Sequence, residues 1–79
     1  MTEPETIDAR GLRCPLPVIR LAARAKELPP GTELALLSTD PAARPDIAAW
    51  CRVRGHDLLS QEPYGGSALR HLVRLKTGG

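Results

Sequence analysis

The chain has 79 residues, of which 42% are hydrophobic and 25% charged, and its formal net charge is +2. This length accommodates one small domain and excludes a second, and the composition is that of globular proteins rather than of disordered or membrane-embedded ones. Because the net charge is small and Trp50 and Tyr64 are the only aromatic residues, no stacking surface for single-stranded nucleic acid is evident and we expect no direct nucleic-acid binding.

The first element along the chain is expected to be a short strand over residues 6–9, where polar and apolar residues alternate. A helix is predicted over residues 15–28, because apolar residues recur there at helical spacing and a Pro-Pro-Gly sequence follows. Residues 33–38 have the apolar pattern of a strand buried on both faces in the middle of a sheet.

A second helix is predicted to begin near Asp40-Pro41, an acceptor side chain followed by a residue of fixed φ, and to end at Gly55. Pro45 would remove a hydrogen bond and clash inside a formed helix, which leaves the start of this helix between residues 40 and 45. Strands over residues 57–62 and 69–76 complete the chain, and the latter alternates regularly.

The expected order is therefore βαβαββ, an α/β chain folded as an α+β two-layer sandwich with a four-stranded mixed sheet and two helices on one face. Residues 1–79 are expected to form one domain, with flexible tails at residues 1–4 and 77–79. If the first two strands are parallel neighbours, the right-handed crossover places the start of the first helix at one edge of the domain.

The segment Cys14-Pro15-Leu16-Pro17 lies at that helix start. Proline is favoured at the first helical position, so Pro15 there makes Cys14 the cap residue. The helix dipole, Arg13 and Arg10 place positive charge near the sulfur, and we expect them to lower the pKa of the thiol. No insertion that could form a pocket or lid is present, so we expect an exposed thiol that other proteins reach.

The second cysteine, Asp40 and the two histidines are interpreted as structural residues rather than as parts of a reactive site. Cys51 shares a helical face with Ile47, which favours core packing over a role as a second redox thiol. Asp40 is interpreted as a helix cap, His56 as a solvated loop residue and His71 as a strand residue rather than a ligand. Neither the number nor the spacing of the cysteines predicts a metal site.

Residues 8–17, which end in Cys-Pro-x-Pro, resemble the N-terminal signature of the TusA/SirA-like sulfur-carrier family. The second-helix segment of that family is resembled, in order and spacing, by Asp40-Pro41, Asp46-Ile47, Trp50-Cys51 and Gly55-His56. The resemblance implies a βαβαββ sandwich in which the cysteine at position 14 accepts sulfane sulfur as a persulfide. The supporting positions of the motif are Arg10, Gly11, Arg13, Pro15, Leu16 and Pro17.

The resemblance also implies partners. A cysteine desulfurase or a rhodanese would supply the sulfur, and a relay protein serving tRNA thiolation, molybdenum-cofactor maturation or sulfur oxidation would receive it. The resemblance further implies that this chain is a sulfurtransferase-like carrier with a covalent persulfide intermediate rather than a stand-alone enzyme. It implies no cofactor other than the sulfane sulfur carried on Cys14.

The start of the chain has neither the basic region nor the apolar stretch of a signal peptide, and no apolar run approaches the roughly 20 residues that span a bilayer. We therefore expect a cytoplasmic protein that does not contact the membrane, in which both cysteines stay reduced.

Alternatives to sulfur transfer on Cys14 remain open at this point. The chain is also consistent with a regulatory protein-interaction module that carries no sulfur, and with a thiol-disulfide redox protein that uses Cys14 and Cys51. Gly78-Gly79 matches the ending of ubiquitin-like carriers that hold sulfur as a thiocarboxylate, but the predicted βαβαββ order disfavours that fold.

Overall fold

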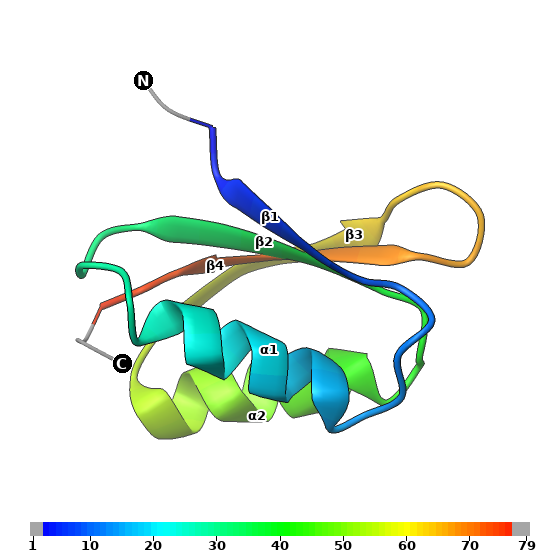
Figure 1. The fold of residues 1–79 in the computed structure, drawn as a ribbon, viewed down its shortest axis with the longest axis horizontal. Helices are drawn as coiled ribbons and strands as arrows, with labels where there is room; N and C mark the ends of the chain where they lie inside the picture. The colour runs from blue at the N-terminus through cyan, green and yellow to red at the C-terminus, as the bar shows by residue number, and fades with distance from the viewer. Residues whose placement is uncertain (1–2, 77–79) are drawn as a thin grey trace.

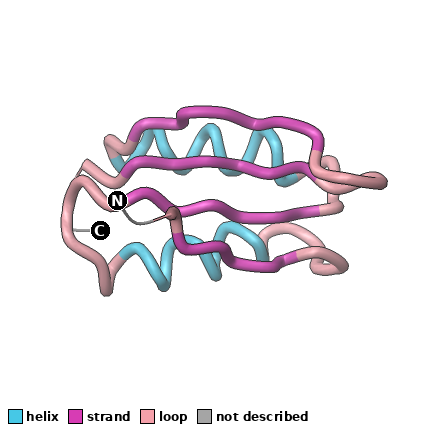
Figure 2. The backbone as a smooth tube through the Cα atoms, turned by 90° about the horizontal axis from the view of Figure 1, so that it is seen from above, coloured by secondary structure: helices cyan, strands magenta, loops and turns pink. Residues whose placement is uncertain are grey.

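The computed structural model describes residues 3–76. Its elements follow the order β1 (Glu5–Ala9), α1 (Leu16–Ala25), β2 (Glu33–Ser38), α2 (Ala43–Arg54), β3 (Asp57–Pro63) and β4 (Leu69–Arg74). The strands form a single sheet in the order β1-β2-β4-β3, in which β1 and β2 are parallel and the other neighbours antiparallel. Both helices cover one face of this sheet (Figure 1, Figure 2). The predicted βαβαββ two-layer sandwich is confirmed.

The ends of the chain bear on two of the predictions. Residues 1–2 and 77–79, which include most of the predicted tails and the whole of Gly78-Gly79, lie outside the described residues. Residues 3 and 4 precede β1 without regular structure.

Helix α1 is shorter at both ends than the predicted range 15–28. It begins at Leu16, with Pro15 as its cap residue, and ends at Ala25. The backbone N–H groups of Glu27 and Leu28 donate to carbonyls three residues earlier, at 3.0 and 3.3 Å. This tighter turn ends the α-helical pattern before the Pro-Pro-Gly sequence is reached.

Helix α2 accommodates Pro45 because that residue lies in its first turn. The helix begins at Ala43, so the missing N–H of Pro45 is one of those that have no partner within the helix. At the other end Gly55 has φ of 78° and ψ of 23°, the left-handed conformation that glycine adopts without steric cost, as predicted.

The core lies between the helices and the covered face of the sheet. Its largest fully buried apolar side chains come from both layers: Leu21, Leu34, Leu36, Ile47, Val73 and Leu75. Strand β2 is central in the sheet, and its Ala35 and Leu37, which face away from the helices, are also buried. The interpretation of this segment as a strand buried on both faces is confirmed.

A polar network crosses the buried face of the sheet at His71. Gln61 uses its amide nitrogen to donate to the Arg44 carbonyl at 2.8 Å and to His71 Nδ1 at 3.0 Å. Nδ1 is therefore an acceptor, and the ring proton on Nε2 donates to Ser38 Oγ at 2.7 Å. Burial lowers the pKa of His71 to about 4, so the ring is neutral.

The interpretation of His56 as a solvated loop residue is wrong. The side chain is buried, and its ring packs against Trp50 with ring centroids 4.8 Å apart. Its Nδ1 accepts a hydrogen bond from the Lys76 backbone at 3.2 Å. The residue after the glycine cap is turned back into the domain, where it covers the end of α2 that lies away from Cys14.

Candidate functional site

The loops that precede the two helices, which include Cys14 and Asp40, lie together at one end of the domain. Because β1 and β2 are parallel and each is followed by a helix, the carboxyl ends of both strands and the amino ends of both helices lie together, with the β3–β4 turn at the same end (Figure 1). The loop of residues 10–15 therefore lies beside the loop of residues 39–42.

Cys14 lies in the first of these loops, one residue before the cap of α1. The Leu16 N–H donates to the Arg13 carbonyl at 2.9 Å, so a turn precedes the helix, and the Cys14–Pro15 peptide bond is cis. The predicted position of Cys14 as the cap residue is wrong, because the cap residue of α1 is Pro15. The side chain is partly buried and packs against the edge of the core rather than standing fully exposed.

Asp40 fixes the position of Cys14 from the neighbouring loop. Its Oδ2 accepts a hydrogen bond from the Cys14 backbone N–H at 2.9 Å, and its Oδ1 accepts one from the Ala42 N–H at 3.0 Å. These hydrogen bonds, together with the nearby charge of Arg13, lower the pKa of Asp40. The interpretation of Asp40 as the helix cap is wrong, because Ala42 is the cap residue of α2 and no side chain caps the helix. Asp40 instead joins the cysteine loop to the residues that precede α2.

The electrostatics of the thiol are opposite to those predicted. Burial raises the pKa of Cys14 to about 11, with further contributions from a hydrogen bond to the Asp46 side chain and from the charges of Asp46 and Asp40. Asp46 lies in the first turn of α2. The charged groups that act on the sulfur are therefore carboxylates contributed by the second helix and its approach, and they favour the protonated thiol.

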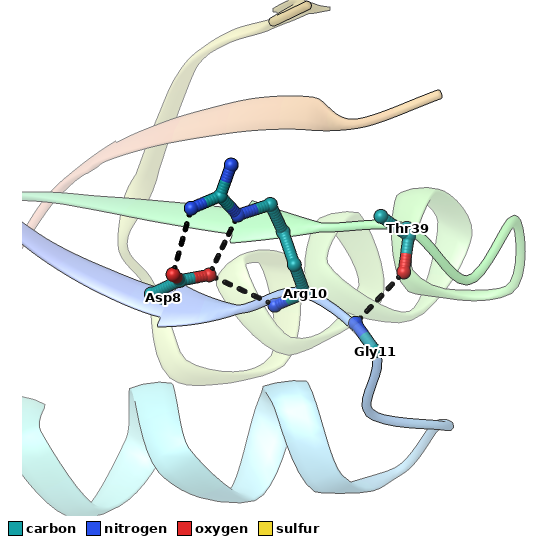
Figure 3. A network of polar contacts seen from close by, with 4 residues as sticks. All are labelled: Asp8, Arg10, Gly11 and Thr39. Carbon is teal, nitrogen blue, oxygen red and sulfur yellow. Dashed lines mark hydrogen bonds and ion pairs between the residues drawn. The ribbon is translucent and has the colours of Figure 1, made fainter. Parts of the chain in front are cut away.

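Arg10 does not supply the positive charge that was expected near the sulfur. Its guanidinium folds back onto Asp8, with Nε 2.9 Å from Oδ1 and Nη2 2.8 Å from Oδ2, and its backbone N–H donates to the same carboxylate (Figure 3). This pairing lowers the pKa of Asp8 to about 2. The positive charge of Arg10 is therefore compensated by the carboxylate of Asp8, a residue of β1.

Gly11 joins the cysteine loop to the end of β2. Its backbone N–H donates to Thr39 Oγ1 at 2.9 Å, and its φ of 84° is one that favours glycine (Figure 3). Beside Cys14, a shallow hollow of about 480 Å³ is lined by Gly11, Leu12, Arg13, Thr39, Asp40 and Pro41. The sequence indicated no pocket, because the hollow is formed by two short loops rather than by an insertion.

The remaining residues of the motif divide between surface and core. Pro17 is buried beneath the first turn of α1, whereas Pro15 is exposed. Leu16 is 47% exposed and Ile19, one turn along the same helix, is 54% exposed. Both are exposed apolar side chains at the start of the helix that follows Cys14.

Cys51 is separated from this site. It is 2% exposed, belongs to the core cluster, and is a free thiol like Cys14. It lies more than one helical turn beyond Asp46 along α2. The interpretation of Cys51 as a core residue is confirmed.

Asp46 is the neighbour of Cys14 that sequence reasoning missed. The available signal was its place in the first turn of a helix that starts at the same end of the domain as the cysteine. Within residues 3–76, no group of three or more histidine, cysteine or acidic side chains is arranged to hold a metal ion. In the same part of the chain, neither helix has the length and apolar character needed to cross a membrane.

Known proteins resemble this chain along most of its length. Residues 5–75 match the family model described as Sulfurtransferase TusA. The sulfur carrier protein TusA of Pseudomonas fluorescens is 40% identical over 75 residues, which cover 87% of this chain and 90% of the relative. The protein of the same name from Pseudomonas entomophila is 44% identical over 64 residues, with 81% and 80% covered.

The fold has a counterpart among solved structures. The crystal structure of a SirA-like protein from Desulfitobacterium hafniense superposes with a TM-score of 0.82, covering 91% of this chain and 97% of that one at 23% sequence identity. At this identity the likeness concerns the fold alone. Because the family model and the relatives both span most of the sequence, the chain belongs to the TusA family, as its Cys-Pro-x-Pro signature predicted.

Proposed function

We propose that this protein is a sulfur carrier in which Cys14 takes up a sulfane sulfur as a persulfide and delivers it to a second protein. The observation that carries the proposal is the placement of the two thiols. Cys14 lies at one end of the domain beside an open hollow, whereas Cys51 is enclosed in the core. The names of the relatives, which are sulfur carrier proteins, support the same conclusion.

The transfer is a displacement at sulfur. The Cys14 sulfur bonds to the terminal sulfur of a persulfide on the donor, the donor's S–S bond breaks, and the donor's cysteine leaves as a thiolate and takes up the proton that Cys14 gave up. Cys14 then carries the persulfide, and a thiolate of the acceptor attacks its terminal sulfur in the same way. No external oxidant or reductant is consumed.

This chemistry assigns roles to the rest of the site. Asp40 holds the backbone of Cys14 in place through both exchanges, and the hollow beside it leaves space for a cysteine-bearing loop of the donor or the acceptor. Leu16 and Ile19 provide an apolar contact for either partner. A cysteine desulfurase or a rhodanese is the proposed class of donor, and a thiol-bearing relay protein the proposed class of acceptor.

The direct test is intact-mass analysis without reductant after incubation with cysteine and a cysteine desulfurase. We expect a gain of about 32 Da, one sulfur atom, on the wild type and on Cys51→Ser, and none on Cys14→Ser. An adduct retained by Cys14→Ser, or none on the wild type with an active donor, would refute the carrier role. A reversible loss of about 2 Da in the wild type alone would instead indicate a Cys14–Cys51 disulfide.

A further inference from the structure

The cysteine loop, residues 10–15, is attached to the neighbouring loop at two points. The Gly11 N–H donates to Thr39 Oγ1 at 2.9 Å, as Figure 3 shows. The Cys14 N–H donates to Asp40 Oδ2, also at 2.9 Å. Thr39 and Asp40 directly follow the end of β2. One short segment therefore holds the cysteine loop both where it leaves β1 and at the thiol.

Two further hydrogen bonds shape the first part of the cysteine loop and are local to it. The Arg10 N–H donates to the Asp8 carboxylate at 3.1 Å, and the Leu12 N–H donates to the Ala9 carbonyl at 3.2 Å. Neither bond reaches α2 or the residues that precede it. The hydrogen bonds that set the place of the thiol relative to the second helix are therefore those accepted by the two side chains of the neighbouring loop.

The bend of the chain at Gly11 depends on a hydrogen bond rather than on packing. Gly11 has a φ of 84°, and apart from its chain neighbours no heavy atom lies within 4 Å of the position that a Cβ would occupy there. A glycine in open space has many accessible backbone conformations. The bond from its N–H to Thr39 Oγ1 favours the one conformation that turns the chain from β1 toward α1.

Exchange of a sulfur atom between two proteins requires that the atom lie at a defined place. The attacking thiolate has to approach the terminal sulfur of a persulfide while both are held by folded chains, and a misplacement of about 1 Å can cost about a hundredfold in rate. A small alkylating reagent diffuses freely and reaches a thiol from any open side. The two reactions therefore respond differently when a loop loses one of its attachments.

We propose that Thr39 is a positioning residue for the Cys14 sulfur, which fixes the bend of the cysteine loop at Gly11 so that partner proteins meet the sulfur in one place. This inference rests on the proposed function and adds to it a residue outside the Cys-Pro-x-Pro motif. Thr39 acts through the backbone of Gly11 and together with Asp40, because the loss of either acceptor leaves the cysteine loop attached to its neighbour at one point.

The first test measures hydrogen exchange of the Gly11 and Cys14 amides by NMR in the isolated protein. Thr39→Val, which replaces the hydroxyl by a methyl group, should raise both exchange rates by about two- to tenfold, the effect of one lost hydrogen bond. Thr39→Ser keeps the hydroxyl and should exchange like the wild type. Thr32→Val is the matched control, because Thr32 Oγ1 donates to the Pro29 carbonyl at 2.8 Å in the segment before β2. An unchanged Cys14 amide in Thr39→Val would overturn the proposal.

The second test measures single-turnover sulfur uptake from a persulfidated cysteine desulfurase. At saturating donor, Thr39→Val should take up sulfur about tenfold more slowly than the wild type, with a similar half-saturating donor concentration and an unchanged rate of Cys14 alkylation by iodoacetamide. Thr39→Ser should restore the uptake rate. Equal uptake by Thr39→Val and Thr32→Val, or slow uptake that Thr39→Ser does not restore, would overturn the positioning role.

A second variant and a stability measurement separate position from folding. Gly11→Ala keeps the Thr39 hydroxyl but disfavours the bend, since alanine adopts a positive φ at a cost. It should reproduce the slow uptake, and uptake equal to that of the wild type would show that the bend does not matter. Urea midpoints identify any variant that is slow because it is unfolded. Absence of uptake by the wild type would refute the carrier role, while amide exchange would still decide whether Thr39 positions the cysteine loop.

Discussion

The backbone N–H of Cys14 donates a 2.9 Å hydrogen bond to Asp40 Oδ2, which ties the loop before α1 to the loop before α2. The two residues are 26 positions apart in sequence. The same carboxylate accepts the Ala42 N–H. The position of the thiol therefore depends on a side chain that, in the sequence, was interpretable only as a helix cap.

We expect Asp40→Ala to destabilise the protein more than Asp40→Asn, because alanine leaves two backbone donors without their acceptor whereas asparagine keeps one acceptor oxygen. Urea denaturation at neutral pH measures the difference as a lower midpoint for the alanine variant. Glu62→Ala removes an exposed carboxylate elsewhere and serves as the control. Equal midpoints for Asp40→Ala and Glu62→Ala would show that Asp40 does not hold the cysteine loop.

A pH dependence follows from the same contact. The pKa of Asp40 is lowered in the folded protein, so its stabilising contribution is fully present above the pKa of an unfolded aspartate, about 3.9, and is lost as the pH falls through the folded value. The difference in stability between the wild type and Asp40→Asn should therefore shrink as the solution is acidified below about pH 4.

The Arg10 side chain leads to the opposite expectation from the one that its sequence position suggested. Because its guanidinium is held by Asp8, Arg10→Gln should leave the pH profile of Cys14 alkylation unchanged. The measurement is the rate of alkylation by iodoacetamide as a function of pH, compared with that of the wild type. The second variant, Asp8→Asn, releases the guanidinium and tests whether an unpaired Arg10 shifts this profile. A profile shifted to higher pH in Arg10→Gln would show that this arginine stabilises the thiolate after all.

The elements of the fold could be predicted because each has a local cause. Alternating residues mark β4, an uninterrupted apolar run marks the central β2, and Gly55 ends α2 through a backbone conformation that glycine adopts readily. The start of α1 was misplaced by one residue, because a turn closed by the Leu16 N–H and the Arg13 carbonyl precedes the helix and Pro15 is its cap residue.

The chemistry of the site could not be predicted, because it depends on which side chains meet across the two loops. A cysteine next to arginines and a helix start indicates a lowered pKa, and nothing local to residues 10–17 reveals that the carboxylates of Asp40 and Asp46 act on it. That Arg10 turns toward Asp8 is equally a matter of side-chain direction on an edge strand. The residues close to Cys14 in sequence correctly predicted where the thiol lies. They predicted a lowered pKa for it, whereas the pKa is raised.

The buried network around His71 predicts a specific loss of stability in Ser38→Ala. This change leaves the His71 Nε2–H without the acceptor that lies 2.7 Å away in a site closed to water, which costs about 1–3 kcal/mol. Ser60→Ala is the matched control, because Ser60 pairs with Leu72 on the opposite face of the sheet and should change stability by less than about 0.5 kcal/mol. Equal effects in urea denaturation would show that the Ser38 hydroxyl does not satisfy His71.

His71 also makes the stability of the whole domain sensitive to mild acid. Burial lowers its pKa from 6.5 to about 4, so the unfolded chain binds a proton more readily, and stability that is complete above pH 6.5 falls as the pH drops toward 4. The loss between neutrality and pH 5 should be about 2 kcal/mol by urea denaturation. His71→Gln should flatten this dependence, and an equally steep loss in that variant would assign the effect to other groups.

The two cysteines should differ clearly in how fast an alkylating agent labels them in the native protein. Burial raises the pKa of both thiols to about 11, so ionisation does not distinguish them, but Cys51 is 2% exposed whereas Cys14 is only partly buried. Iodoacetamide at about pH 9 should therefore place one label on the native protein, at Cys14, and a second at Cys51 only when urea unfolds the domain. Peptide mapping assigns the sites, with Cys14→Ser as the control that stays unlabelled in the native state. Labelling of native Cys51 at a rate near that of Cys14 would mean that the core opens at α2. It would support the alternative of a thiol-disulfide redox protein, which requires a second accessible cysteine.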